Sequence, residues 1–160
     1  MSFERSDGEV SATYRPLAAV PDLVGPTASM TFVAPGSLTR RQFGIFRRDM
    51  QPHAGGPDPH IHRTFSESFY MLSGTVRFYD GSAWVEATEG DFLYVPKGGI
   101  HAFSADSDEP ASMLILFAPG KARERFFVEM EEIRRSGRKL TDRQWTEVWA
   151  RHDQYMVSVR

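Results

Sequence analysis

The 160-residue sequence contains no cysteine. This absence excludes disulfide bonds, a thiolate nucleophile and thiolate metal sites, so any metal ligands have to come from histidine, aspartate and glutamate. The formal net charge is only −2, which gives no general attraction to nucleic acid or to anionic lipid. The longest purely apolar run, Met113 to Ala118, is too short to cross a bilayer.

The first residues also lack an apolar run, because Glu4 and Asp7 interrupt them, and they do not form a secretory signal. These absences favour a soluble, cytoplasmic protein without membrane contact. The apolar share of 41% and the charged share of 25% are ordinary for a globular protein, and the length suits one domain with its own core.

The chain divides into three parts. Residues 1–27 contain three prolines and no regular period, and are predicted to be an N-terminal arm with one short strand over residues 12–15. Residues 28–118 are predicted to form an all-β, mainly antiparallel barrel or sandwich, since short apolar segments alternate there with turn residues. The expected strands cover residues 28–34, 40–50, 67–73, 75–79, 83–87, 90–95, 100–105 and 112–118.

Residues 119–160 are predicted to be a C-terminal helical extension. Phe126, Met130 and Ile133 have the spacing of one helix face, and this helix is expected to end near Gly137. Residues 141–144 fit a capping box that opens a second helix, whose apolar residues are Trp145, Val148 and Trp149. Both apolar faces are expected to pack on the β body.

Histidine and glutamate side chains are grouped in a pattern typical of a metal site. His60 and His62 point to the same side of an extended backbone, and Glu67 is close enough for a bent strand to return it beside them. His101 begins a later strand after a proline–glycine turn. Three imidazoles and one carboxylate would fill four positions around a divalent ion and leave two open. A lone histidine on a strand is usually a satisfied polar residue, but three of the five histidines fall in these two short segments.

The two segments resemble the motifs of the cupin superfamily. His60, His62, Glu67 and Gly74 match the later positions of the first motif, G-x5-H-x-H-x(3,4)-E-x6-G, while its leading glycine is displaced by one residue, to Gly55. The second motif, G-x5-P-x-G-x2-H-x3-N, is matched except at its last position, which is Ala105 here; the matching residues are Gly90, Pro96, Gly98 and His101.

The resemblance implies a double-stranded β-helix, or jelly-roll barrel, and a homodimer. It also implies that His60, His62, Glu67 and His101 are the metal ligands. One divalent transition metal ion is expected, and the ligand set suits Fe, Mn, Ni, Co, Cu or Zn without selecting among them.

Alternation along the strands gives candidates for a substrate pocket. If Glu67 faces inward, so do Phe69 and Met71, and if His101 does, so does Phe103. Such an apolar pocket would suit a planar aromatic or unsaturated small molecule, although each residue could equally belong to the barrel core. The polar residues Arg47, His53 and Tyr94 could also reach the cavity, and alternation does not place them.

Several segments of the sequence resemble the sequences of small single-domain cupins that are similar to quercetin 2,3-dioxygenase. These segments are residues 67–74, 95–103 and 117–120. This resemblance implies a metal-dependent dioxygenase acting on an enolic or phenolic substrate, with Glu67 as both ligand and general base. A redox-neutral cyclase or isomerase and a non-catalytic binder of small ligands are alternatives, because the ligand motifs do not select a reaction. The basic segment between the two helices is diluted by glutamates and does not favour nucleic-acid binding.

Overall fold

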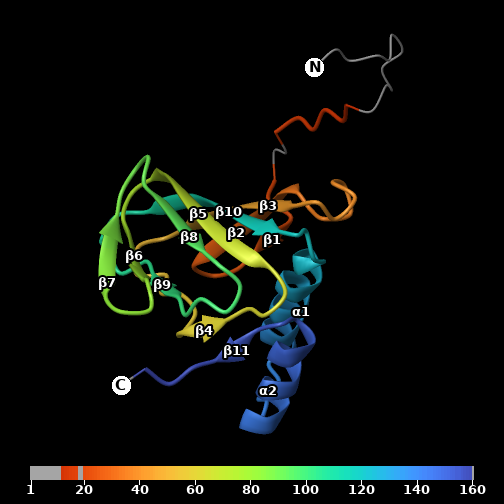
Figure 1. Ribbon diagram of the computed structural model, residues 1–160, viewed down its shortest axis with the longest axis vertical. Coiled ribbons are helices and arrows are strands. Elements are labelled where there is room, and N and C mark those ends of the chain that lie inside the picture. Colours follow the sequence, from red (N-terminus) through yellow and green to blue (C-terminus); the bar gives the residue numbers. More distant parts are fainter. Residues whose placement is uncertain (1–11, 18–19, 160) are drawn as a thin grey trace.

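The computed structural model describes residues 12–17 and 20–159 (Figure 1). Antiparallel strands precede two helices, and one further strand follows them. The strands before the helices are β1 (Leu23–Val24), β2 (Ala28–Ala34), β3 (Gly44–Met50), β4 (His60–Ile61), β5 (Ser66–Ser73), β6 (Val76–Tyr79), β7 (Trp84–Ala87), β8 (Phe92–Val95), β9 (Ala102–Ser104) and β10 (Ala111–Ala118). The last elements are α1 (Arg123–Ser136), α2 (Asp142–Arg151) and β11 (Tyr155–Met156).

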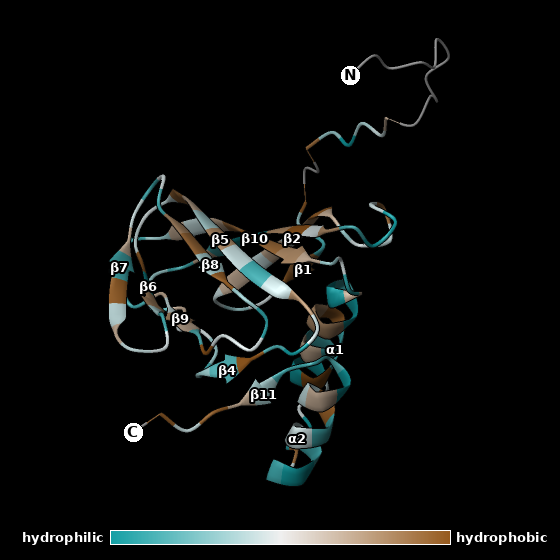
Figure 2. Cartoon of the chain, in the orientation of Figure 1, coloured by the Kyte–Doolittle hydropathy of each residue, from teal (hydrophilic) through white to brown (hydrophobic). Residues whose placement is uncertain are grey.

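Two sheets form the body of the molecule. The larger has six strands in the order β1-β2-β3-β10-β5-β8, and the smaller has three in the order β7-β6-β9. They pack against each other through aromatic residues, since the ring of Phe69 on β5 lies 4.9 Å from Phe78 on β6 and 5.8 Å from Phe103 on β9. Figure 2 shows strongly hydrophobic residues on strands of the large sheet and also on β7 and α1. The predicted mainly-β jelly roll is confirmed.

Alternation on β10 shows how the sequence builds this core. Met113, Ile115 and Phe117 are buried, whereas Leu114 and Leu116 between them are only half-buried. Because paired residues of antiparallel strands point to the same side, the neighbours of these residues on β3 and β5 face inward as well. The inward-facing residues of β3, β10 and β5 therefore form rows across the large sheet.

Two glycines in the predicted turns are required by the backbone. Gly74 has φ +71°, and a Cβ there would lie 2.3 Å from the carbonyl oxygen of Pro110. Gly98 has φ +78° and donates its N–H to the carbonyl of His62 at 2.7 Å. Both positions lie in the left-handed region that side chains disfavour, so the fold requires glycine there.

Both predicted helices are present. The capping box at Thr141 and Gln144 is confirmed, and Gly137 ends α1 in a left-handed conformation. The ring of Phe127 on α1 packs 5.2 Å from that of Phe46 on β3. The end of α2 is attached to α1, because His152 and Arg151 both bind Glu129. Among the described residues, no helix is both long and apolar enough to traverse a lipid bilayer.

The sequence-based prediction was wrong in three places. Residues 12–15 do not form a strand, and the N-terminal part contributes β1 instead. The strand expected from residue 40 begins at Gly44, because Arg40 and Arg41 have positive φ angles and belong to a turn. The segment after α2 was not predicted to be a strand, yet β11 pairs with β4 (Figure 1).

Candidate metal centre

The backbone brings two distant histidines together. His60 and His101 form an isolated antiparallel bridge, in which each N–H donates to the carbonyl of the other residue at 3.0 and 3.1 Å. His62 directly follows β4, and Glu67 lies on the inner face of β5. Backbone pairing therefore places His101 beside His60. The spacing of these residues in the sequence did not determine this position.

The four side chains form one buried cluster. His60, His62, Glu67 and His101 are all at most 6% exposed, and one ligand atom from each lies within 4.8 Å of the others. Atoms bound at about 2.1 Å to a single ion can be no more than about 4.2 Å apart, so a small adjustment would let all four bind it. Nitrogen and carboxylate donors of this kind fit a first-row divalent ion.

Each histidine is oriented by a second hydrogen bond. The Nδ1 atoms lie next to backbone carbonyl oxygens: His60 to Asp58 at 2.7 Å, His62 to Asp153 at 2.6 Å and His101 to Gly99 at 3.1 Å. With Nδ1 held by a carbonyl, Nε2 of each ring faces the centre of the cluster, where a metal would bind. All three rings therefore have the orientation required of metal ligands.

Glu67 is held by two of these histidines. Its Oε2 atom lies 2.9 Å from Nε2 of both His62 and His101. Burial alone would raise the pKa of Glu67, but the hydrogen bonds from His101 and His62 outweigh it and keep this pKa below its ordinary range. Burial would lower the pKa of His101, and the contact with Glu67 raises it overall. The Glu67 carboxylate and the His101 imidazole therefore stabilise each other's charged forms.

His60 differs from the other two histidines. Burial, with the nearby His101 acting in the same direction, lowers the pKa of His60 to about 3. Its imidazole is therefore neutral at any physiological pH, as a metal ligand has to be.

The C-terminal segment completes the site from the outside. Asp153 has φ +55°, and besides its carbonyl bond to His62 its carboxylate accepts from the N–H groups of Arg63 and Thr64 at 3.0 and 2.8 Å. Next to it, Met156 of β11 pairs with His60 of β4. The capping box predicted α2, the helix before this segment. Nothing in the sequence indicated that the segment itself contacts the histidine cluster.

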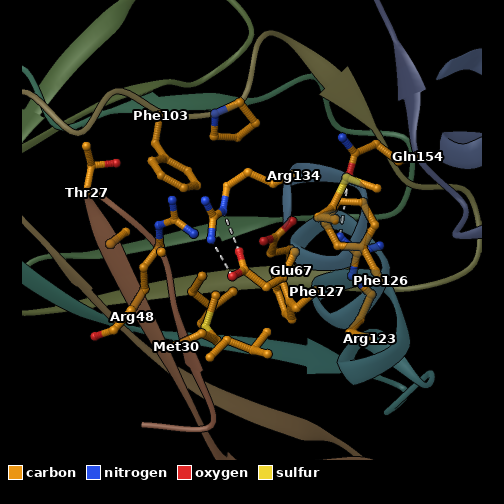
Figure 3. A pocket seen from close by; sticks show the side chains of 18 of the residues that line it. Thr27, Met30, Arg48, Glu67, Phe103, Arg123, Phe126, Phe127, Arg134 and Gln154 are labelled. Atoms are coloured by element: carbon orange, nitrogen blue, oxygen red, sulfur yellow. Dashed lines mark hydrogen bonds and ion pairs between the residues drawn. The ribbon is translucent and has the colours of Figure 1, made fainter. Parts of the chain in front are cut away.

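A pocket of about 370 Å³ opens on the cluster through His60 and Glu67 (Figure 3). Phe69 and Phe103, two of the expected substrate-binding residues, line it, whereas Met71 is buried in the core outside its lining. Phe126 and Phe127 of α1 form another wall. The first helix therefore contributes to the pocket in addition to packing on the barrel.

Three arginines that the sequence had not indicated also line the pocket, namely Arg48, Arg123 and Arg134. Arg123 is 4% exposed; its guanidinium lies 4.1 Å from the ring centroid of Phe126, and its Nη1 donates to the carbonyl of His152 at 2.9 Å. Burial lowers the pKa of Arg123 to about 10, which still leaves it charged at neutral pH.

The polar residues that alternation could not place do not line this pocket. Arg47 points away from the core and pairs with Asp49 at 2.9 Å. His53 is exposed and lies 2.8 Å from Asp108, and Tyr94 is exposed on β8. Parity along β3 could have found the correct arginine, since Phe46 faces inward and Arg48 is two residues further on.

Comparison with known proteins agrees with this architecture. Residues 46–117 match the family model of the cupin domain. Residues 46–117 form a cupin domain. The matched segment contains all four residues of the histidine and glutamate cluster.

One curated relative and several solved structures are similar to this cupin. Over 61 residues it is 31% identical to quercetin 2,3-dioxygenase of Bacillus subtilis, which covers 38% of this chain and 18% of that protein. The chain thus matches less than a fifth of that relative's length. The structure of KdgF from a Halomonas species aligns with a TM-score of 0.55 and 18% identity, over 63% of this chain and 86% of that one. The polyketide cyclase RemF from Streptomyces resistomycificus gives 0.51 and 17%, over 58% and 66%.

Proposed function

We propose that this cupin is a metal-dependent dioxygenase that acts on a small enolic or phenolic molecule. The observation that carries the proposal is the position of the ligand cluster, which forms one end of an aromatic pocket through His60 and Glu67. The local likeness to quercetin 2,3-dioxygenase supports the same reaction class.

In this proposal His60, His62, Glu67 and His101 hold one divalent transition metal ion. A bound ion would polarise a substrate oxygen and acidify its hydroxyl group. Glu67 would accept the hydroxyl proton, because its side chain lines the pocket as well as the cluster and so lies beside the position of a metal-bound hydroxyl group. Phe69 and Phe103 would hold the ring of the substrate, and the surrounding apolar walls would exclude water.

Oxygen uptake with a flavonol or a catechol tests the proposal. Protein loaded separately with each candidate metal should consume dioxygen and substrate together with at least one of them, and a His62→Ala variant should not. Turnover that continues unchanged without oxygen would replace this function by a redox-neutral one, such as cyclisation or isomerisation. Binding without any turnover would make the protein a ligand-binding cupin. The expected homodimer and cytoplasmic location stay predictions.

A further inference from the structure

Arg48 is a charged residue on the inner face of the large sheet. In the register of β3, its neighbours on the adjacent strands are Met113 of β10 and Met30 of β2, which are 0% and 4% exposed. Phe46 and Met50, the inward positions on either side of it, are also buried. A guanidinium at this position loses hydration without gaining an apolar contact of equal value, so the fold needs a reason to hold it there.

No acidic side chain among the described residues balances this charge. Arg47 beside it pairs with Asp49, and Arg134 across the pocket pairs with Glu131 at 2.6 Å, but none of the ion pairs found within those residues includes Arg48. Its Nε atom is enclosed and has no hydrogen-bond partner. Burial lowers the pKa of Arg48, and no carboxylate offsets that effect.

The guanidinium borders the pocket instead of the solid core. It lies 5.6 Å from the ring centroid of Phe103, and Figure 3 shows the Arg48 and Arg134 side chains reaching toward the same part of the cavity. The charged residues of the pocket wall are three arginines and two glutamates, and both glutamates are already engaged. A divalent ion on Glu67 would make this wall more positive still, which favours an anionic ligand.

Arg48 and the metal cluster lie at different ends of this pocket. Glu67 pairs with Phe117 of β10, whereas Arg48 pairs with Met113, four residues along the same strand. Four residues of strand span roughly 13 Å between backbone positions, and the long arginine side chain shortens the gap that a ligand has to bridge. One small molecule could therefore contact both ends.

We propose that Arg48 binds a carboxylate of the substrate, so that the substrate is an enolic or phenolic acid whose acidic group lies away from its metal-binding oxygen. The substrate class rests on the function proposed above. A planar guanidinium matches a carboxylate with two parallel hydrogen bonds, and a carboxylate in the pocket would balance the charge that the described residues leave unpaired. Arg134, already paired with Glu131, would contribute charge without supplying the main contact.

A binding measurement with zinc-loaded protein tests this inference, since zinc is redox-inert and no oxygen chemistry is involved. The probes are dihydrocaffeate, a catechol that carries a propanoate, and its neutral amide; protocatechuate is a shorter acid of the same kind. In calorimetry, at least one acid should bind about tenfold or more tightly than its amide. The difference between the two acids reports the distance from the metal to Arg48.

Two variants make the test specific. Arg48→Gln should remove the preference for the acid, whereas Arg47→Gln on the same strand should keep it. Equal binding of acid and amide to the unaltered protein, absence of binding by both, or a preference that persists in Arg48→Gln would overturn the proposal. Because the first comparison uses no variant, misfolding of Arg48→Gln would not protect the proposal. Failure of oxygen uptake would leave this result untouched and bears only on the reaction.

Discussion

The two ends of the pocket differ in the hydrogen bonding of their buried polar side chains. At the metal end every imidazole Nδ1 has a carbonyl partner and Glu67 has two histidine partners. At the other end the Nε of Arg48 is enclosed without a partner among the described residues. Since buried polar groups are normally hydrogen-bonded, the two ends are expected to respond differently to substitution.

The residues of the metal end are hydrogen-bonded to one another or to the backbone, whereas Arg48 is proposed to gain its partner only when a ligand binds. A satisfied network orients its members before anything binds, and breaking it costs affinity for the ion. An unsatisfied charge costs folding free energy until a ligand pairs with it.

The largest effect is expected when a ligand is removed. His101→Ala should weaken metal binding by more than about 100-fold, beyond the range known for outer partners of a metal site. Elemental analysis and titration against a competing chelator would measure this. His53→Ala is the control, because that exposed histidine pairs with Asp108 and does not belong to the cluster. Stoichiometric metal of unchanged affinity in His101→Ala would refute the ligand assignment.

A smaller loss is expected when the outer support of His62 is weakened. Asp153→Ala removes the carboxylate contacts to residues 63 and 64 and places alanine at a positive φ angle, so the carbonyl that orients His62 should shift. Metal affinity should fall about 10- to 100-fold in the chelator titration. Asp153→Asn should retain most of it, because asparagine tolerates this conformation and its amide oxygen can still accept one of the two backbone hydrogen bonds. Equal affinity in both variants would show that the C-terminal segment does not position the ligand.

Acid should weaken metal binding through His101. The pKa of His101 is raised above its ordinary 6.5 in the metal-free protein, so this proton stabilises the fold fully below about pH 6.5 and ceases to do so as the pH rises through the raised value. Metal has to displace the proton, and its affinity should therefore rise about tenfold per pH unit below that pKa and level off above it. Chelator titrations between pH 5 and 9, about the range in which histidine titrates, would detect this. A flat profile would show that the proton is absent.

The smallest expected effect lies at the arginine end. Arg48→Met should raise the free energy of unfolding of the ligand-free protein by about 1 kcal/mol, because an apolar side chain replaces an unpaired charge among methionines. Arg47→Met, which breaks an outward ion pair, should lower it by about 0.5 kcal/mol or less. Urea denaturation of both variants measures the difference. A marked loss of stability in Arg48→Met would mean that Arg48 is a structural residue.

The two ends of the pocket also differ in how far the sequence predicts them, since the four cluster residues were predicted and Arg48 was not. The metal end depends on local spacing, such as one residue between His60 and His62, and on turn residues that fix the neighbouring strands. No sequence motif marks Arg48 as a pocket residue. Its role depends on which face of β3 points inward and on the absence of an acidic side chain near it among the described residues. Register, and hence both facts, is set by β10 more than sixty residues later.

Asp153 could not be predicted for a related reason. Its link to His62 spans 91 positions and runs through a backbone carbonyl, which every residue type possesses. The strand pairing of β11 with β4 involves only two residues on each side, too few for a periodic pattern. The helices before it were predictable from their spacing and capping box, but their return path to the barrel was not.

The pairing of β11 with β4 has a consequence for the order of synthesis. A ribosome makes the chain from its N-terminus, so His60, His62 and Glu67 emerge long before the segment that orients one of them. A nascent chain that ends before residue 153 has all four donor side chains but not the carbonyl that fixes His62. If the four residues bind a metal as proposed, its full affinity is expected only after the C-terminal segment has folded back onto β4.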